Sequence, residues 1–287
     1  MNIRQFLVPG SGKKFSVGKL DADSTAGVRD EKEGVAMLEK CRTDLAEMQD
    51  KLYAQDKWAV LVVLQAMDAA GKDSTIKFVM SGVNPQGCQV VSFKEPSREE
   101  LDHDFMWRYM KNLPERGRIG IFNRSYYEEV LVVRVHPQLL DKQSLPDPCK
   151  KDVWERRFAD INAVERYLFH NGVVPIKIFL NVSKEAQLKR LLKRLDRPNK
   201  NWKFAESDIA ERALWNDYMH AYESVLQNTS TKHAPWYVVP ADNKWYTRVA
   251  VAEIITQRMA ALDLRYPAVS KERQLALLKL RRKLAGA

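Results

Sequence analysis

Residues 58–80 read WAVLVVLQAMDAAGKDSTIKFVM, and this stretch decides the fold. The aliphatic run at 60–64 predicts a central parallel β-strand that is buried on both faces. Small residues follow at 69–71, so backbone N–H groups there can approach a phosphate closely where a helix begins and its dipole is positive. Lys72 adds a positive charge at the same turn. The stretch therefore predicts a strand, a phosphate-binding loop and a helix.

The loop departs from the usual P-loop pattern at two positions. Ala66 stands in place of the first glycine, and Asp73 replaces the Ser or Thr that follows the lysine. Asp68 and Asp73 would repel a phosphate unless a hard cation bridged them. Mg²⁺ suits that role because it binds one or two carboxylates together with phosphate oxygens and water. The alternative is a plain strand-to-helix turn with a solvated lysine, since such motifs are weak on their own.

The composition limits the class of protein. The chain has 287 residues, and 47 basic against 37 acidic side chains leave a formal charge of +10. This surplus favours a polyanionic partner such as nucleic acid, an anionic membrane or a phosphate chain. Cys41, Cys88 and Cys149 form no CxxC pair and predict neither a disulfide framework nor a zinc site, so a reducing cytoplasm fits best. No signal-peptide core and no apolar run as long as a membrane span is found.

The chain is expected to have three segments. Residues 1–57 predict a surface arm followed by an amphipathic helix from about residue 31 to 55, and residues 266–287 predict a basic amphipathic helix. Residues 58–265 would form one α/β domain with a doubly wound parallel sheet, in which ligands bind beyond the carboxyl ends of the strands. After the first strand we expect strands at 88–93, 118–125, 173–182 and 236–241, helices at 101–112, 154–169 and 245–262, and a loop at 136–148.

Polar residues follow the carboxyl ends of two of these strands. Lys94 comes after the second strand, and Asn123 and Arg124 end the third. Lys94 is therefore a candidate phosphate contact, and the planar guanidinium of Arg124 can hold a phosphate with two hydrogen bonds. Lys94 also fits a plain helix-entry loop, in which Ser97 is the N-cap and Glu100 its capping-box partner.

Residues 184–226 form the second informative stretch. Eight basic residues and only two acidic ones lie between 184 and 204, and leucines recur there at helical spacing. A basic helix, a turn and a return helix resemble the mobile lid that closes over phosphates in nucleotide kinases and excludes water. Such charge runs are more often solvated faces, but a chain that also carries a phosphate loop favours the lid.

Several segments taken together resemble the type 2 polyphosphate kinase family. They are LQAMDAAGKDSTIK, SFKEPS, LDHDFMWR, GIFNRSYYEEVLVVRVHP, LKRLLKRLDRPNKNWKF and HAPWYVVPADNKWYTR, and the likeness covers nearly the whole chain. The resemblance implies a P-loop kinase-like, three-layer α/β/α fold with a central parallel sheet and a helical lid. It also implies Mg²⁺-dependent, reversible phosphoryl transfer from inorganic polyphosphate to a nucleoside phosphate.

The resemblance also implies roles for individual residues. Asp68, Lys72 and Arg124 would be catalytic, with Asp68 also a metal ligand. Further phosphate or nucleotide contacts would be Ala69, Ala70, Gly71, Asp73, Ser74, Lys94, Asn123 and Glu128. Lys193, Arg194, Arg197 and Lys203 would bind polyphosphate from the lid. Many members have Asp where this chain has Asn123, and the Asn version resembles the subgroup that phosphorylates both AMP and ADP.

The expected mechanism follows from charge. The terminal phosphate of an acceptor nucleotide has a second pKa near ~6, so it is largely ionised at pH 7 and needs no general base. The site has to align two polyanions and neutralise the charge on the moving phosphoryl group. We expect adenine nucleotides as partners, with guanine left open, and a cytoplasmic homo-oligomer that binds neither nucleic acid nor membrane. Two rivals are an ATP-dependent nucleotide kinase of the thymidylate kinase type and a non-enzymatic nucleic-acid-binding protein.

Overall fold

A five-stranded parallel sheet lies at the centre of the molecule. The structure is a computed structural model that describes residues 1–10 and 14–286, so part of the expected arm, residues 11–13, lies outside the described residues. The strand order is β2-β3-β1-β4-β5. The strands are β1 (Ala59–Gln65), β2 (Cys88–Ser92), β3 (Ile119–Asn123), β4 (Val173–Asn181) and β5 (Trp236–Pro240). Every residue of β1 is buried between β3 and β4, which confirms the central strand.

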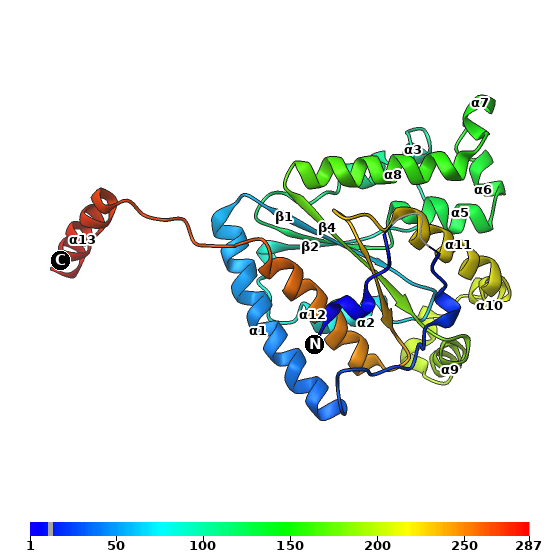
Figure 1. The fold of residues 1–287 in the computed structure, drawn as a ribbon, viewed down its shortest axis with the longest axis horizontal. Helices are drawn as coiled ribbons and strands as arrows, with labels where there is room; N and C mark the ends of the chain where they lie inside the picture. The colour runs from blue at the N-terminus through cyan, green and yellow to red at the C-terminus, as the bar shows by residue number, and fades with distance from the viewer. Residues whose placement is uncertain (11–13, 287) are drawn as a thin grey trace.

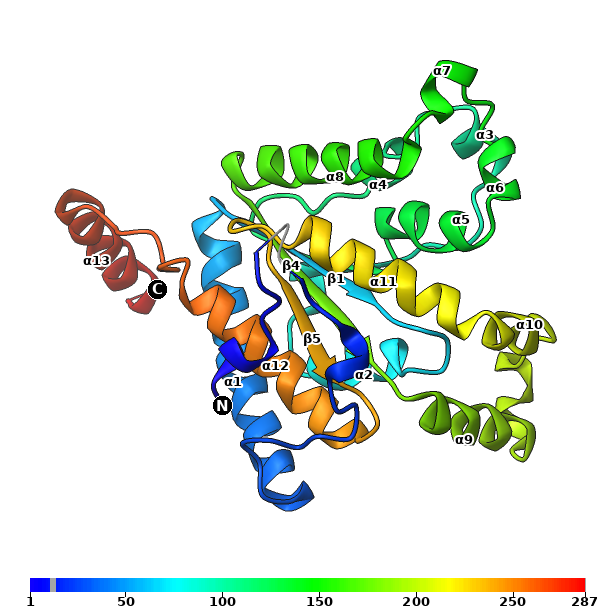
Figure 2. The ribbon, with the colours of Figure 1, turned by 45° about the vertical axis from the view of Figure 1, so that its right-hand side comes forward.

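Helices cover both faces of the sheet (Figures 1 and 2). On one face lie α1 (Glu31–Gln55), α2 (Lys72–Val79) and α12 (Lys244–Ala260). On the other lie α8 (Val153–His170) and α11 (Trp215–Thr229). Each helix turns an apolar side to the buried strands, so one apolar core extends over both faces of the sheet. The expected α/β fold with a central parallel sheet is confirmed.

The core between the sheet and α8 contains a fully buried ion pair. Lys177 of β4 lies with its Nζ 2.6 Å from Oε2 of Glu165 on α8. The same Nζ donates hydrogen bonds to the hydroxyl of Tyr127 at 2.8 Å and to the carbonyl oxygen of Thr229 at 2.6 Å. These bonds compensate for the loss of water around the charge, and they tie the middle of the sheet to α8 and α11.

Two expectations about the region after β2 are wrong. The expected helix at 101–112 is two short helices, α3 (Arg98–Leu101) and α4 (Trp107–Met110), because the Asp104 side chain accepts the backbone N–H of Met106 and starts a new turn. The expected loop at 136–148 contains α6 (Gln138–Asp141) and α7 (Asp147–Lys150), and α5 (Val132–Val135) precedes it. Prolines at or near the first turn of a helix permit these short helices.

The lid is a set of three helical pieces at the carboxyl end of the sheet. It comprises α9 (Lys184–Leu195), a 3₁₀-helix at Pro198–Lys203 and α10 (Ser207–Ala213), which leads into α11 (Figure 2). The expected single return helix is therefore two helices. Ser183 caps α9, and its hydroxyl accepts the N–H of Ala186 at 3.0 Å.

The C-terminal helix α13 (Lys271–Ala285) stands apart from the sheet on an extended connector (Figure 1). It carries no buried residue, as far as the structure describes it. Within the described ranges, 1–10 and 14–286, none of the helices combines the length and apolar character needed to cross a bilayer.

Candidate functional site

The phosphate loop connects β1 to α2 through two residues in the left-handed region. Ala69 has a φ of 60° and Gly71 a φ of 112°. Glycine adopts this conformation at no steric cost, whereas alanine pays about 1 kcal/mol for it. Gly71 is the N-cap of α2 and has no side chain to occupy the first N–H groups of that helix. These N–H groups and the helix dipole therefore face an anion that enters the loop.

Lys72 lies beneath the loop. Its Nζ donates hydrogen bonds to the carbonyl oxygens of Ala66 at 2.7 Å and Met67 at 3.4 Å. Burial lowers the pKa of Lys72 and the Arg124 charge lowers it further, while Asp68 and neighbouring carboxylates act in the opposite direction. A bound phosphate would offer this ammonium a charged acceptor in place of backbone carbonyls.

Arg124 is held between two carboxylates at the end of β3. Its Nη2 lies 2.8 Å from Oδ1 of Asp68, and its Nη1 lies 3.4 Å from Oε2 of Glu128. The pKa of Arg124 is raised above its ordinary value, chiefly by Glu128 and also by Asp68, although burial opposes them. The two carboxylates orient a guanidinium that remains charged, and this guanidinium can bind phosphate oxygens.

Asp73 links the start of α2 to β3 and to the lid. Its Oδ1 accepts a hydrogen bond from Nδ2 of Asn123 at 2.8 Å, and its Oδ2 lies 3.7 Å from Nζ of Lys203. Asn123 also donates to the hydroxyl of Ser92 at 3.4 Å. Asn123 thus places a neutral amide beside Asp73, at a position where a carboxylate would repel it.

The carboxylates at this site fit a magnesium ion. Asp68 and Asp73 line the same cleft, and their hard oxygens suit Mg²⁺. The described residues contain no cluster of three or more His, Cys, Asp or Glu side chains that could enclose a metal by themselves. Mg²⁺ in such sites commonly takes several ligands from water and substrate phosphates.

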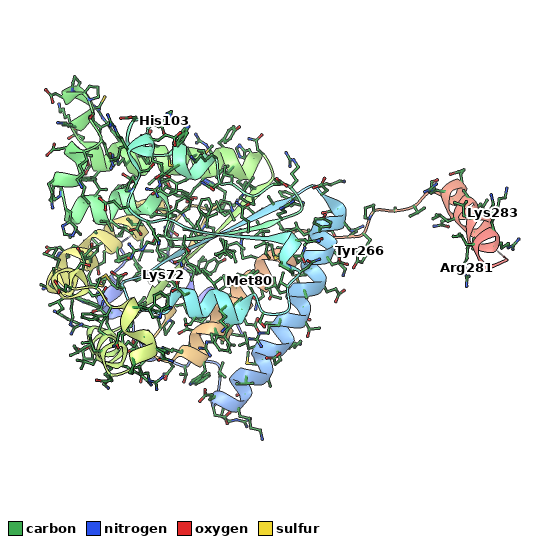
Figure 3. All side chains as sticks on the ribbon, turned by 180° about the vertical axis from the view of Figure 1, so that it is seen from behind. Lys72, Met80, His103, Tyr266, Arg281 and Lys283 are labelled. Atoms are coloured by element: carbon green, nitrogen blue, oxygen red, sulfur yellow. The ribbon has the colours of Figure 1, made fainter. Side chains whose placement is uncertain are left out.

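A basic cleft of about 870 Å³ separates the phosphate loop from the lid. We call it the loop–lid cleft. Its basic wall consists of Arg190, Lys193, Arg194, Lys200, Lys203 and Lys244. Burial lowers the pKa of Lys244 to about 8, and the charges of Arg190, Lys200 and Lys193 add to this effect. Lys72 lies far from α13, whose Arg281 and Lys283 mark the opposite side of the molecule (Figure 3).

A second cavity, of about 390 Å³, opens beside the loop–lid cleft. Apolar side chains of Phe93, Leu101 and Tyr109 line it together with polar groups. Phe93, Lys94, Glu95 and Arg124 line both spaces, so the two join at these residues. Cavities of this size with a mixed lining bind small organic molecules. The site therefore offers a long basic cleft and a compact cavity that share four lining residues, of which Lys94 and Arg124 are cationic.

Comparisons with known proteins identify the family. The family model of polyphosphate kinase 2 (PPK2) matches residues 28–267. The chain belongs to the polyphosphate kinase 2 family. An ADP-polyphosphate phosphotransferase of Rhodopseudomonas palustris is 47% identical over 283 residues, which is 98% of each chain. An AMP/ADP-polyphosphate phosphotransferase of Meiothermus ruber is 41% identical over 269 residues, covering 92% of this chain and 96% of the relative.

A crystal structure of polyphosphate kinase 2 from Arthrobacter aurescens shares the fold. It superposes with a TM-score of 0.87 at 41% identity and covers 97% of this chain and 96% of its own. This agreement extends the polyphosphate kinase 2 assignment from sequence to three-dimensional structure.

Most residues that the sequence suggested for a polyphosphate kinase 2 site lie around the loop–lid cleft. Those that line it are Asp68, Ala69, Gly71, Lys72, Asp73, Ser74, Lys94, Asn123, Arg124, Lys193, Arg194 and Lys203. Glu128 lines the second cavity. Ala70 is buried behind the loop, and Arg197, at the turn after α9, is not one of the described residues that line the cleft.

Sequence reasoning missed the second cavity and the role of two α9 side chains. The cavity is assembled from the loop after β2, from α3, α4, α5 and α6, from the segment after β3 and from Glu211 of α10, and no local pattern joins these segments. Gln187 and Arg190 bind backbone carbonyls of the loop more than a hundred residues away. Arg190 was visible only as one member of the basic run.

Proposed function

We propose that this polyphosphate kinase 2 family member is a phosphotransferase that moves a phosphoryl group from inorganic polyphosphate to ADP, and also to AMP, in a reversible reaction. The observation that supports this most directly is the junction of the two spaces at Arg124 and Lys94. Two phosphorylated substrates can meet there, one along the basic cleft and one in the compact cavity. The names of the Rhodopseudomonas and Meiothermus relatives, given above, support the same substrates.

The loop–lid cleft suits the polymer. Five basic side chains of the lid and Lys244 of α12 line one side of the cleft, and the phosphate loop lines the other. A flexible chain of phosphates can contact many such cations at once, and each contact is a charge-assisted hydrogen bond. The lid residues Lys193, Arg194 and Lys203 are the polymer contacts in this proposal.

The second cavity suits the nucleoside of the acceptor. Phe93, Leu101 and Tyr109 offer apolar surface to a base and a sugar. Lys94 and Arg124, at the junction, would then hold the acceptor phosphate.

The chain's own groups perform three tasks in the transfer. Arg124 and Lys94 align the acceptor phosphate, which is already ionised at pH 7 and needs no base. The loop amides and Lys72 neutralise charge on the transferring phosphoryl group, and the lid excludes water that would otherwise accept it. Asp68 and Asp73 would hold Mg²⁺, which supplies further neutralisation of phosphate charge when bound.

The test is synthesis of ATP from ADP, Mg²⁺ and polyphosphate with no other phosphoryl source. We expect ATP to form, ADP to form when AMP replaces ADP, and both products to disappear in Lys72→Ala. An ATP-dependent kinase of the thymidylate kinase type would form no product without ATP. Lack of product from the folded wild-type protein at any polyphosphate length would contradict the proposal.

Location and assembly belong to the same proposal. Cys41, Cys88 and Cys149 are free, which suits a reducing cytoplasm. A homo-oligomer would give α13, with its exposed leucines, a second copy of the chain to contact.

A further inference from the structure

Two side chains of the lid helix α9 bind the backbone of the phosphate loop. Nη1 of Arg190 donates hydrogen bonds to the carbonyl oxygens of Ala70 at 2.7 Å and Ala69 at 3.2 Å. Nε2 of Gln187 donates to the carbonyl oxygen of Asp68 at 3.1 Å. Three consecutive carbonyl groups of the loop therefore face the first turns of α9.

Arg190 also fixes the loop to the end of β5. Its Nη2 donates to the carbonyl oxygens of Ala241 at 2.5 Å and Asp242 at 2.9 Å. One planar guanidinium thus joins two chain segments that lie about 170 residues apart in sequence, and its fixed fork sets the distance between them. A lysine ammonium, which is a compact point charge, cannot reproduce this fork.

These bonds determine which way the loop amides point. In a trans peptide the N–H points away from the carbonyl oxygen of the same plane. Holding the Asp68 and Ala70 carbonyls against α9 therefore turns the N–H groups of Ala69 and Gly71 to the opposite side of the loop. An anion bound on that side meets donors that are already oriented, and this orientation lowers the cost of binding a developing charge.

The second helix of the lid is connected to the same bonds. Nη1 of Arg212 on α10 donates to the carbonyl oxygen of Lys184 at 2.6 Å and to Oε1 of Gln187 at 2.8 Å. Gln187 is buried and donates its own hydrogen bond to the Asp68 carbonyl, so it links Arg212 to the phosphate loop. A displacement of α10 or α9 would therefore move the peptide group that carries the Ala69 N–H.

We propose that Arg190 and Gln187 are positioning residues for phosphoryl transfer. They hold the loop carbonyls so that the loop amides face the phosphate, and they couple the loop to the position of the lid. This inference rests on the proposed function for its kinetic readout, but the loop geometry that it describes can be tested without turnover.

The kinetic test compares Arg190→Lys with Lys189→Met. Arg190→Lys keeps the charge and removes the fork, so we expect kcat for ATP formation to fall about 100-fold, the usual effect when one donor, here a loop amide, is no longer oriented toward the developing charge. The KM for ADP should stay unchanged, because Arg190 does not line the second cavity. Lys189 is exposed on the same helix, so Lys189→Met removes a charge without touching the loop and should keep the wild-type kcat.

The structural test is amide hydrogen exchange of the peptide that covers residues 66–72. We expect faster exchange there in Arg190→Lys, with wild-type exchange in β1 and in Lys189→Met. If Arg190→Lys unfolds, Gln187→Met takes its place, with about a tenfold fall in kcat expected from the loss of the hydrogen bond to the Asp68 carbonyl.

The outcomes separate this inference from the proposed function. A wild-type protein without ATP synthesis contradicts the proposed function, while loop exchange still decides the role of Arg190. Wild-type kcat in Arg190→Lys, or loop exchange that the substitution leaves unchanged, would overturn the inference. A purely electrostatic role for Arg190 predicts that Arg190→Lys keeps the wild-type kcat.

Discussion

Arg124 occupies a backbone conformation that arginine seldom adopts. Its φ is 66°, and its backbone N–H donates to the carbonyl oxygen of Leu64 at 3.1 Å. The left-handed conformation costs about 1 kcal/mol. The surrounding contacts maintain it, and it places the guanidinium where the two cavities join. Such strain concentrates at functional sites, which agrees with the proposed role of Arg124.

Replacing Arg124 by lysine tests whether its guanidinium, held by Asp68 and Glu128, is needed to bind the phosphate. In Arg124→Lys a single ammonium cannot contact both Asp68 and Glu128 and still bind a phosphate with two bonds. We expect kcat/KM for ADP to fall about 100-fold. Steady-state kinetics at saturating polyphosphate measure this. Arg118→Lys is the control, since Arg118 forms only a surface ion pair with Glu115 and should keep wild-type kinetics.

The lowered pKa of Lys244 predicts how polymer binding depends on pH. Its pKa is lowered to about 8, so its charge is present below pH 8 and is lost as the pH rises through that value. The affinity for a polyanion should therefore fall between pH 7 and pH 9, by roughly threefold, the contribution of a partly exposed ion pair. The KM for polyphosphate measured across this range tests it.

The matched variant for this pH effect is Lys244→Arg. A guanidinium stays charged throughout the range, so its profile should be flat between pH 7 and pH 9. If the KM of Lys244→Arg for polyphosphate rises with pH as it does in the wild type, another group causes the pH effect.

At the scale of elements, the parts set by local pattern were predictable. The aliphatic run of β1, the small residues of the loop and the basic run of α9 all lie where the sequence indicated. The helix expected at 101–112 was wrong because one side chain, Asp104, interrupts it. The hydrogen bonds from Arg190 to the phosphate loop and the second cavity depend on contacts between distant segments. Such contacts produce no periodic pattern in a single sequence.

The buried pair of Lys177 and Glu165 is a further contact of this kind, and it tests how β4 is joined to α8. Lys177→Met leaves the Glu165 carboxylate without its cation in a fully buried place. We expect the free energy of unfolding to fall by about 3–5 kcal/mol, the usual cost of breaking one side of a buried pair. Urea denaturation measures it.

The double variant shows whether the unpaired charge is the cause. Lys177→Met combined with Glu165→Gln removes the buried negative charge and should recover part of the lost stability. If the double variant is less stable than Lys177→Met, packing and hydrogen bonds rather than charge determine the loss.

At the scale of the whole molecule, the site and α13 lie at opposite ends (Figures 1 and 2). The lid, with its basic wall, closes one end of the sheet, and α13 extends from the other. Basic side chains are therefore concentrated both in a cleft suited to polyphosphate and on a helix at the opposite end of the molecule.

The helix α13 buries none of its side chains against the part of the chain that the structure describes. An isolated helix of 15 residues is marginal in water, and α13 exposes Leu275, Leu277, Leu278, Leu280 and Leu284. These leucines lie on more than one side of the helix, which is typical of a helix that packs against other helices. Its six basic residues and one acidic residue disfavour pairing with an identical α13, so a different surface of a second copy is the expected partner.

Removal of residues 268–287 tests this assembly. We expect light scattering coupled to gel filtration to give a smaller molar mass than that of the full chain, because the deletion removes the leucines that a second copy would cover. The kcat for ATP formation should stay within the wild-type range, since α13 lies at the far end from Lys72 (Figure 3). An unchanged molar mass would show that α13 does not hold copies together, and an unchanged mass with lost activity would place α13 in the function of a single chain.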